Sequence, residues 1–172
     1  MRWLSSLRNF LRVNGEKTEA QKSEGYELEP HDLVSRFIYS SRAFSAQHGF
    51  AKPGAFNPEP YSKLSVFHST GLSDKEIWGN GRKTLSAQRG RDKIYCRADL
   101  SVAIFISHLL KVIRDDDPFE RHTSVVGWPN NANPDQRKAD VKAICLELSQ
   151  DPEVKLVIPQ KPITKDDSEP LA

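Results

Sequence analysis

The chain has 172 residues, which corresponds to about one domain, and its hydrophobic share of 37% is low enough to indicate polar ends around a single core. Its 25 Lys and Arg nearly balance its 23 Asp and Glu, so the overall charge does not point to nucleic acid, which needs a concentrated basic face. The two cysteines, Cys96 and Cys145, are too widely spaced for a disulfide scaffold or a zinc ribbon, and no apolar run approaches the roughly 20 residues of a membrane span, so we expect a cytoplasmic protein with no cofactor.

A basic amphipathic pattern predicts a helix over residues 1–13. Such a helix could lie on a membrane surface as a peripheral contact, dock into a groove of a protein partner or fold back on its own domain. We favour protein docking, because three Arg over about three turns bind lipid only marginally. A mitochondrial presequence would also fit and is ranked below a bacterial cytoplasmic protein. The apolar side, expected to dock on the partner, consists of Trp3, Leu4, Leu7, Phe10 and Leu11.

A polar stretch over residues 14–29 predicts a linker between this segment and the rest of the chain. Apolar residues at near-helical spacing then predict a helix over residues 33–44, although their branched and aromatic side chains would also suit a strand. The prolines that follow, Pro53, Pro58 and Pro60, predict an extended loop.

The clearest local signature follows a short apolar run over residues 64–68, which predicts a buried strand. Ser73 and Glu76 form a capping box, so we expect a helix to begin at Asp74. Residues 79–81, Gly-Asn-Gly, predict an interruption of this helix, because each glycine costs about 1 kcal/mol relative to Ala in a helix interior.

The second half of the chain consists mainly of predicted strands. Residues 93–100 alternate between apolar and polar side chains, as a half-buried strand does. Residues 102–113 are apolar and branched and predict one strand or two short ones. Residues 123–128 and 154–158 predict two further strands, with a helix capped by Asn133 between them.

Together these elements predict an α+β fold. We expect a single compact domain over residues 30–160, with a mixed sheet of about five strands and two to three helices, preceded by the amphipathic N-terminal helix. Residues 161–172 are polar, contain two prolines and predict a loose C-terminal tail.

Two histidines, His68 and His122, are each followed two residues later by a hydroxyl, Thr70 and Ser124. This spacing resembles the paired motif of the two-histidine phosphoesterases, in which each histidine transfers a proton and each hydroxyl binds the phosphate. The resemblance implies that the two histidines are catalytic and that the two hydroxyls bind a nucleotide or an RNA end. That family prefers an apolar residue between histidine and hydroxyl, where this chain has Ser and Thr. The alternative is that each histidine only bonds the backbone at a strand end.

Arg97 and Asp99 lie two residues apart, on one face of the strand predicted over residues 93–100. If Arg121 or His122 of a neighbouring strand joined them, the set could bind a phosphate or a carboxylate, so Arg97 and Arg121 are candidate substrate ligands. The alternative is an Arg–Asp pair on a solvated sheet face.

Positive charge is concentrated between residues 82 and 97, where Tyr95 could add a stacking surface for nucleic acid. The alternative is a solvated loop whose charge is neutralised by the acidic residues 115–117. Those consecutive carboxylates precede a proline and predict a turn, and no His or Cys joins them at ligand spacing, so we expect no metal. The candidate nucleic-acid contacts are Lys83, Arg89, Arg91 and Lys93.

Several strings within the predicted domain, among them Arg-Ala-Asp-Leu at residues 97–100 and His-x-x-Val-Val-Gly-Trp-Pro at residues 122–129, resemble those of small bacterial proteins of uncharacterised function. The resemblance covers most of the predicted domain. It implies a bacterial, single-domain protein and carries over no activity or site residue.

The sequence contains no complete catalytic signature, which favours a non-catalytic accessory module that docks on a macromolecular partner. In this hypothesis the N-terminal helix binds a protein partner, the α+β domain is the recognition body, and nucleic acid is a second, more weakly supported partner. The alternative is a small metal-independent two-histidine phosphoesterase. Convergence of His68 and His122 on one cleft would favour that enzyme, and their separation would favour the module.

Overall fold

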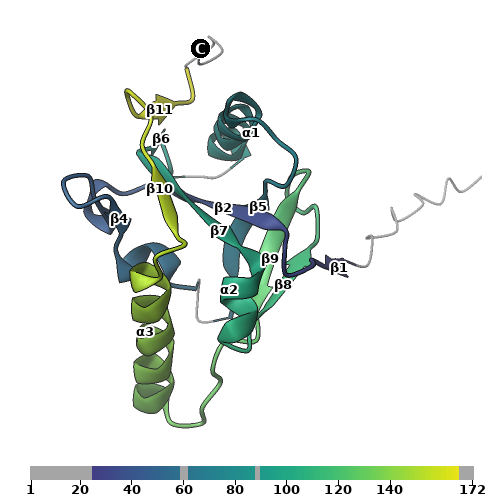
Figure 1. Cartoon of the computed structure of the whole chain (residues 1–172), viewed down its shortest axis with the longest axis vertical. Helices are drawn as coiled ribbons and strands as arrows, with labels where there is room; N and C mark the ends of the chain where they lie inside the picture. Colours follow the sequence, from purple (N-terminus) through teal and green to yellow (C-terminus); the bar gives the residue numbers. More distant parts are fainter. Residues whose placement is uncertain (1–24, 59–61, 88–89, 167–172) are drawn as a thin grey trace, which may run out of the picture.

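The computed structural model describes residues 25–58, 62–87 and 90–166, and a seven-stranded antiparallel sheet is at their centre (Figure 1). The strand order is β1-β8-β9-β5-β2-β7-β10. The predicted helix over residues 1–13 lies outside the described residues, as does most of the predicted linker. The strands of this sheet are β1 (Tyr26–Glu27), β2 (Leu33–Ile38), β5 (Leu64–His68), β7 (Cys96–Ser101), β8 (Lys111–Arg114), β9 (His122–Val126) and β10 (Lys155–Val157).

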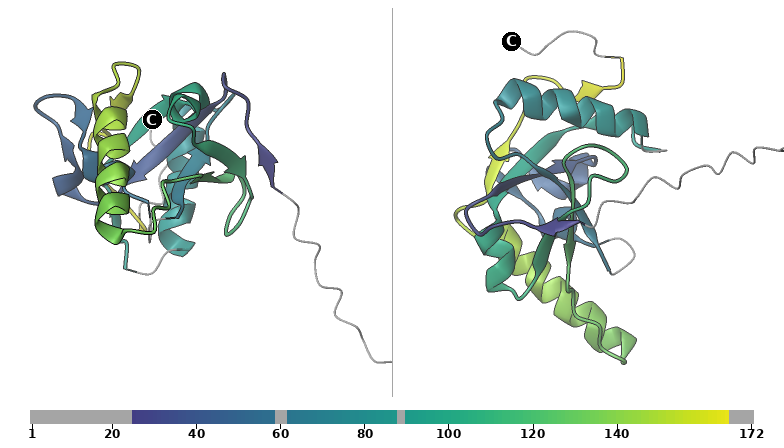
Figure 2. Two further views of the ribbon diagram at one scale, coloured as in Figure 1. Left: turned by 90° about the horizontal axis from the view of Figure 1, so that it is seen from below. Right: turned by 90° about the vertical axis from the view of Figure 1, so that its right-hand side faces the viewer.

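Within the described residues, three α-helices cover the two faces of the sheet (Figure 2). Phe37 and Phe67 pack with residues of α1 on one face, which we call the α1 face. Val34 and Val66 pack with residues of α2 and α3 on the other, which we call the α3 face. The helices are α1 (Asp74–Ala87), α2 (Val102–Ser107) and α3 (Pro134–Gln150), with the 3-10 turns η1 (Ser41–Ala43) and η2 (Pro53–Phe56).

The central strand β2 corrects two predictions: residues 33–44 do not form a single helix, and the sheet is antiparallel with seven strands. Val34 and Ile38 are buried on the α3 face, and Phe37 is buried on the α1 face. Because both faces of β2 are covered, it lacks the alternation of a half-exposed strand, and its apolar spacing resembles that of a helix.

The apolar stretch over residues 102–113 also differs from the prediction, since α2 precedes the strand β8. The helix is only six residues long, and Ser101 at its N-cap makes no side-chain capping bond. Its residues Val102 and Phe105 are fully buried on the α3 face. A short buried helix without a capping signal cannot be distinguished from a strand by apolar content alone.

Helix α1 begins at Asp74, as predicted, and continues through residues 79–81, where an interruption was expected. Gly81 faces the sheet closely enough that a Cβ atom there would lie 3.0 Å from both Ile94 Cδ1 and Phe37 Cε1. The glycine therefore allows the helix to approach the sheet, and packing outweighs its low helix propensity.

Several other predicted elements are confirmed. The strand over residues 64–68 coincides with β5. At the start of α1, the Ser73 N–H donates to Glu76 Oε2 at 2.8 Å, as a capping box requires. Asn133 caps α3 by accepting hydrogen bonds from the N–H groups of Asp135 and Gln136.

The small pairings at the rim differ from the predicted boundaries. The predicted strand over residues 93–100 is divided at Tyr95 into β6 (Lys93–Ile94) and β7, and β6 pairs with β11 (Ile163–Thr164) inside the segment expected to be a loose tail. Ile163 is fully buried against the α1 face. The remaining hairpin is β3 (Phe44–Ser45) with β4 (Phe50–Ala51). Nowhere in the described ranges is a helix both long and apolar enough to cross a membrane.

Candidate functional site

The two histidines noted in the sequence lie on opposite faces of the sheet. His122 of β9 is the cross-strand partner of Phe67, which packs under α1. His68 follows Phe67 on β5 and therefore points to the other face, where its cross-strand partner is Val34. The sheet separates the two imidazoles, so the shared phosphate cleft that the phosphoesterase alternative requires does not form. The motif could not reveal this, because its spacing carries no information about strand register.

On the α1 face, His122 links a serine to an aspartate. Its Nε2 lies 2.8 Å from Ser65 Oγ, and its Nδ1 lies 2.5 Å from Asp115 Oδ1. Ser124, predicted to bind a phosphate, instead donates to the other oxygen of the same carboxylate, Asp115 Oδ2, at 2.7 Å. We call Ser65, His122, Asp115 and Ser124 the His122 network.

The surroundings hold the imidazole of this network in place. Asp115 follows β8, and its N–H donates to the His122 carbonyl at 3.1 Å. The ring of Phe119 packs edge-on against the imidazole, with 5.0 Å between ring centroids. His122 is 7% exposed, whereas Ser65 is only half-buried. The imidazole is therefore fixed by its neighbours, while solvent reaches the serine.

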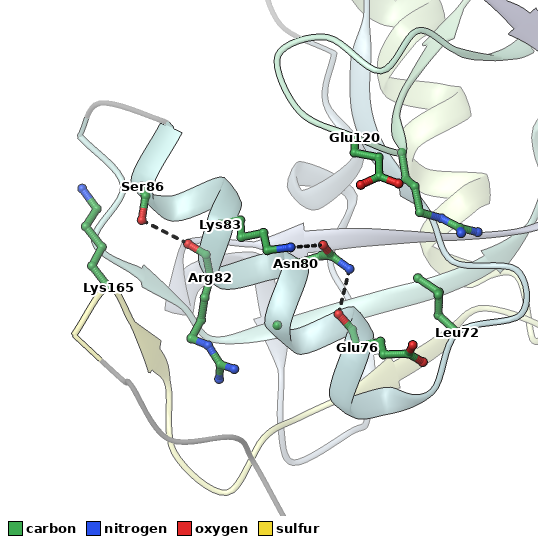
Figure 3. A pocket seen from close by; sticks show the side chains of 10 residues that line it. Leu72, Glu76, Asn80, Arg82, Lys83, Ser86, Glu120 and Lys165 are labelled. Atoms are coloured by element: carbon green, nitrogen blue, oxygen red, sulfur yellow. Dashed lines mark hydrogen bonds between the residues drawn. The ribbon is translucent and has the colours of Figure 1, made fainter.

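A charged groove of about 670 Å³ opens between α1 and the segment that leads into β9 (Figure 3). Four cationic side chains line it, from three separate segments of the chain, together with two carboxylates. In Figure 3 the carboxylates lie toward one end, with Leu72, and Arg82 and Lys165 lie toward the other. The charged lining residues are Arg82, Lys83, Arg121, Lys165, Glu76 and Glu120.

Three of these four cationic side chains, Arg82, Lys83 and Lys165, have either a weak hydrogen-bond or ion-pair contact or an atom without a partner among the described residues. Arg82 Nη1 is buried and has no hydrogen-bond partner among the described residues. Lys83 Nζ lies 3.4 Å from Asn80 Oδ1. Lys165 Nζ lies 3.7 Å from Asp92, whose side chain is 83% exposed. An exposed ion pair such as that of Lys165 contributes little to stability, and the long contact of Lys83 is to a neutral amide, so both ammonium groups can turn to an anion at little cost in stability.

The residues predicted to contact nucleic acid do not form one continuous patch. Lys83 lines the groove. Arg91 lies over the ring of Tyr39, 4.3 Å from its centroid, and lines a separate, smaller cavity. Lys93 is exposed on β6. Arg89 lies outside the described residues, so its placement stays a prediction.

Arg97 lies beneath α1 and is 2% exposed, which corrects the alternative of a solvated sheet face. Its Nε donates to both carboxylate oxygens of Asp99 at 3.0 Å, and its Nη2 contacts Asp74 at the start of α1. The guanidinium carbon lies 4.6 Å from the ring centroid of Trp78. Helix α1 thus covers the arginine with both a carboxylate and an aromatic ring.

Neither Arg121 nor His122 joins this pair, although the sequence suggested one of them. The cross-strand neighbour that does is Ser35 of β2, whose hydroxyl donates to Asp99 Oδ1 at 2.6 Å. Strand β2 was expected to be a helix, and for that reason Ser35 could not be placed beside β7.

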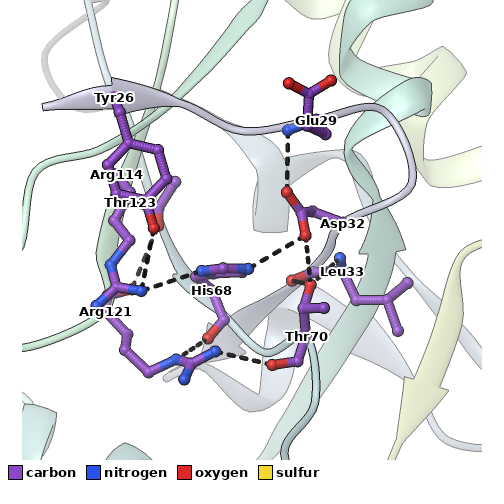
Figure 4. Close-up of polar contacts among 9 residues, drawn as sticks. All are labelled: Tyr26, Glu29, Asp32, Leu33, His68, Thr70, Arg114, Arg121 and Thr123. Carbon is purple, nitrogen blue, oxygen red and sulfur yellow. Dashed lines mark hydrogen bonds and ion pairs between the residues drawn. The ribbon is translucent and has the colours of Figure 1, made fainter.

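His68 belongs to a second polar cluster, on the α3 face at the end of β5 (Figure 4). Arg114 Nη1 lies 3.4 Å from its Nδ1, and Asp32 Oδ1 lies 3.5 Å from its Nε2. The second contact is too long for an ordinary hydrogen bond, so Nε2 has no such partner among the described residues. Thr70, the other predicted phosphate ligand, accepts from the Leu33 N–H at 2.7 Å and donates to Asp32 at 3.1 Å.

The surroundings of His68 favour its neutral form. Burial lowers the pKa of His68 below its ordinary value of 6.5, the Arg121 guanidinium lowers it further, and Asp32 opposes both. Burial raises the pKa of Asp32, but hydrogen bonds from the Glu29 N–H and Thr70 and the nearby imidazole outweigh it, so this pKa lies below its ordinary 3.8.

Arg121, predicted as a substrate ligand, instead donates hydrogen bonds to backbone carbonyls at this end of the sheet. Its Nε donates to the His68 carbonyl at 2.9 Å, and its Nη2 donates to the Thr70 carbonyl at 2.8 Å. Its backbone φ of 64° lies in the left-handed region, and its N–H donates to Asp116 Oδ1. Such strain requires support from the surroundings, which Asp116 provides.

The two cysteines are unsuited to nucleophilic chemistry. Burial raises the pKa of the Cys96 thiol to about 12 and that of the Cys145 thiol to about 11, so both are protonated at neutral pH. Across the described residues, no three His, Cys, Asp or Glu side chains gather as metal ligands would.

Sequence reasoning missed Ser65 and Asp115. Ser65 is a single serine between the apolar residues Leu64 and Val66 of β5, and Asp115 was assigned to a turn. The only available signal is that Ser65, His122 and Ser124 share one face once β5 and β9 are paired in the observed register. That register cannot be read from either strand alone.

Comparisons of the chain with protein-family models, with curated proteins and with solved structures found no match, so fold and geometry carry the functional argument.

Proposed function

We propose that the protein is a binding module that docks on a macromolecular partner, and that the groove beside α1 receives the phosphate backbone of a nucleic-acid strand. The observation that carries the proposal is the convergence of cations from three separate segments of the chain on one groove. Backbone phosphates are bound by such cations without regard to base sequence.

The state of the cations and carboxylates favours an anionic ligand. The buried Nη1 of Arg82 lacks a partner among the described residues, and a buried donor without one is unfavourable, so an anion in the groove would favour a reorientation of this guanidinium toward it. Glu76 is already engaged by the N–H and hydroxyl of Ser73 at the start of α1, so part of its charge is neutralised within the helix cap. The positive charge that lines the groove therefore exceeds the negative charge that is free to oppose it.

The experiment measures binding of the full chain to a fluorescently labelled single-stranded oligonucleotide by anisotropy, at several salt concentrations. We expect the double variant R82Q/K83Q to bind about fivefold or more weakly at low salt and to reduce the slope of log affinity against log salt by about 1.4, since each phosphate contact to a single strand contributes about 0.7. Equal affinity of the variant and the unchanged protein, or no binding by the unchanged protein, would contradict the proposal.

The matched control is K138Q/K142Q, which removes two exposed lysines from α3 on the opposite side of the sheet. Both double variants lower the net charge by the same amount. If the two weaken binding equally, the attraction comes from the overall charge and the groove has no special part in it.

The predicted protein-docking helix over residues 1–13 adds a second element to this proposal. Its apolar side could anchor a protein partner, with a membrane surface as the alternative. Deletion of residues 1–13 separates the two elements, because it should leave oligonucleotide affinity nearly unchanged while removing capture of a protein partner. Loss of oligonucleotide affinity on deletion would assign the nucleic-acid contact to this segment instead of the groove.

A further inference from the structure

The His122 network arranges its atoms in the order that general-base activation of a serine requires. Ser65 Oγ lies 2.8 Å from His122 Nε2, and Asp115 Oδ1 lies at the other ring nitrogen, Nδ1. The first distance falls inside the range of about 2.6–3.2 Å over which a side-chain base takes a proton directly.

The hydrogen-bond partners also determine which nitrogen carries the proton. An ionised carboxylate can only accept hydrogen bonds, so the contact with Asp115 assigns the proton of the neutral imidazole to Nδ1. Nε2 then offers its lone pair to the Ser65 hydroxyl. Asp115 is held in turn by the Ser124 hydroxyl at 2.7 Å, so it acts as a positioning residue for the base.

The base is buried and the serine is partly exposed, as a site with an activated nucleophile requires. The base is 7% exposed and has the Phe119 ring against it, which keeps water from competing for Nε2. Ser65 is half-buried, so part of the residue is open to solvent. The other serine of the network, Ser124, is 5% exposed and contacts the carboxylate, not the imidazole.

We propose that Ser65 is a nucleophile that accepts acyl groups from carboxylic esters, with His122 as its base. In this step Ser65 Oγ forms a bond to the ester carbonyl carbon and its proton passes to His122 Nε2. The bond from that carbon to the leaving alkoxide breaks, and the alkoxide takes the proton from Nε2. The products are an alcohol and acyl-Ser65, and this activity does not depend on nucleic-acid binding.

The test is covalent labelling of the full chain by an alkyl fluorophosphonate, read by intact mass and by mapping of the modified peptide. The reagent forms an Oγ–P bond and releases fluoride, while the serine proton passes through His122 to solvent. We expect one adduct per chain, on Ser65, and none in the S65A variant. No adduct at all, or the same adduct in S65A, would overturn the proposal.

Two further variants test the base and its positioning residue. H122Q and D115N should label at least about 100-fold more slowly, which is the usual contribution of a positioned general base, with circular dichroism confirming that they fold. The matched control is S107A, because Ser107 is exposed and donates to the Ile104 carbonyl, and the described residues show no hydrogen bond between its hydroxyl and an imidazole. Its labelling rate should be unchanged. If a folded H122Q variant labels at the wild-type rate, His122 is not the base. If H122Q does not fold, the comparison of the wild-type protein with S65A still tests whether Ser65 is the nucleophile.

Discussion

The two faces of the central sheet are covered by helices but are built differently. On the α3 face, residues such as Leu100, Val112 and Leu148 form one continuous apolar core. On the α1 face, a smaller apolar cluster around Phe37 and Phe67 is flanked by buried polar groups, among them Arg97 and His122. The α3 face also holds a buried histidine, His68, but it lies at the end of β5, where Arg114 and Asp32 contact it. Buried polar groups stabilise a fold less than apolar packing does, and they are found more often where a protein binds a ligand or performs chemistry.

The largest effect should come from removing the buried cation of the α1 face. Arg97→Ala leaves Asp99 without its cation and takes away the group that packs against Trp78. We expect the free energy of unfolding to fall by about 3–5 kcal/mol, because breaking a buried ion pair leaves an uncompensated charge. Urea denaturation measures this, and a loss below about 1 kcal/mol would show that α1 packs equally well without the arginine.

The corresponding change on the α3 face is Leu148→Ala. Leu148 is fully buried among apolar neighbours, so the truncation removes hydrophobic burial and leaves a cavity. We expect a loss of about 2–5 kcal/mol in the same urea assay. It should leave fluorophosphonate labelling of the folded protein unchanged, since the His122 network lies on the α1 face, across the sheet from Leu148. Slower labelling would mean that the two faces are coupled.

Replacing each of two glycines of α1 by alanine should change stability by less than the two truncations above, and in opposite directions. Gly81→Ala places a Cβ 3.0 Å from Ile94 and Phe37, so we expect a destabilisation of about 1–3 kcal/mol from overpacking. Gly79→Ala meets only the Arg82 side chain, at 3.9 Å, and should stabilise the protein by up to about 1 kcal/mol through helix propensity. Thermal unfolding of both variants checks the sign, and equal shifts would mean that Gly81 does not set the approach of α1 to the sheet.

The smallest effect concerns pH and His68. Because its folded pKa lies below the ordinary 6.5, the unfolded chain binds more protons between the two values, and stability contributed by the neutral imidazole is lost as pH falls through that window. We expect the melting temperature to fall from pH 7.5 toward pH 5.5, and His68→Gln to fall less steeply. Parallel curves for the two proteins would assign the pH dependence to other groups.

The sequence was most informative where signals are local. The Ser73–Glu76 capping box placed the start of α1, and Asn133 placed the start of α3, because both motifs operate within one turn. Residues 33–38 were assigned to the wrong element, since a strand covered on both faces has no period of two. The candidate site depends on which strands pair. His122 was noted in the sequence, but Ser65 and Asp115 are brought next to it only by the pairing of β9 with β5 and with β8.

The most direct test of the account is the ratio of oligonucleotide dissociation constants between R82Q/K83Q and K138Q/K142Q, measured at low and at physiological salt. We expect loss of the α1 cations to weaken binding about fivefold or more and loss of the α3 lysines to change it less than about twofold, with the difference shrinking as salt rises. A ratio near one at low salt would contradict it, because it would mean that the groove beside α1 binds phosphate no better than any other part of the surface.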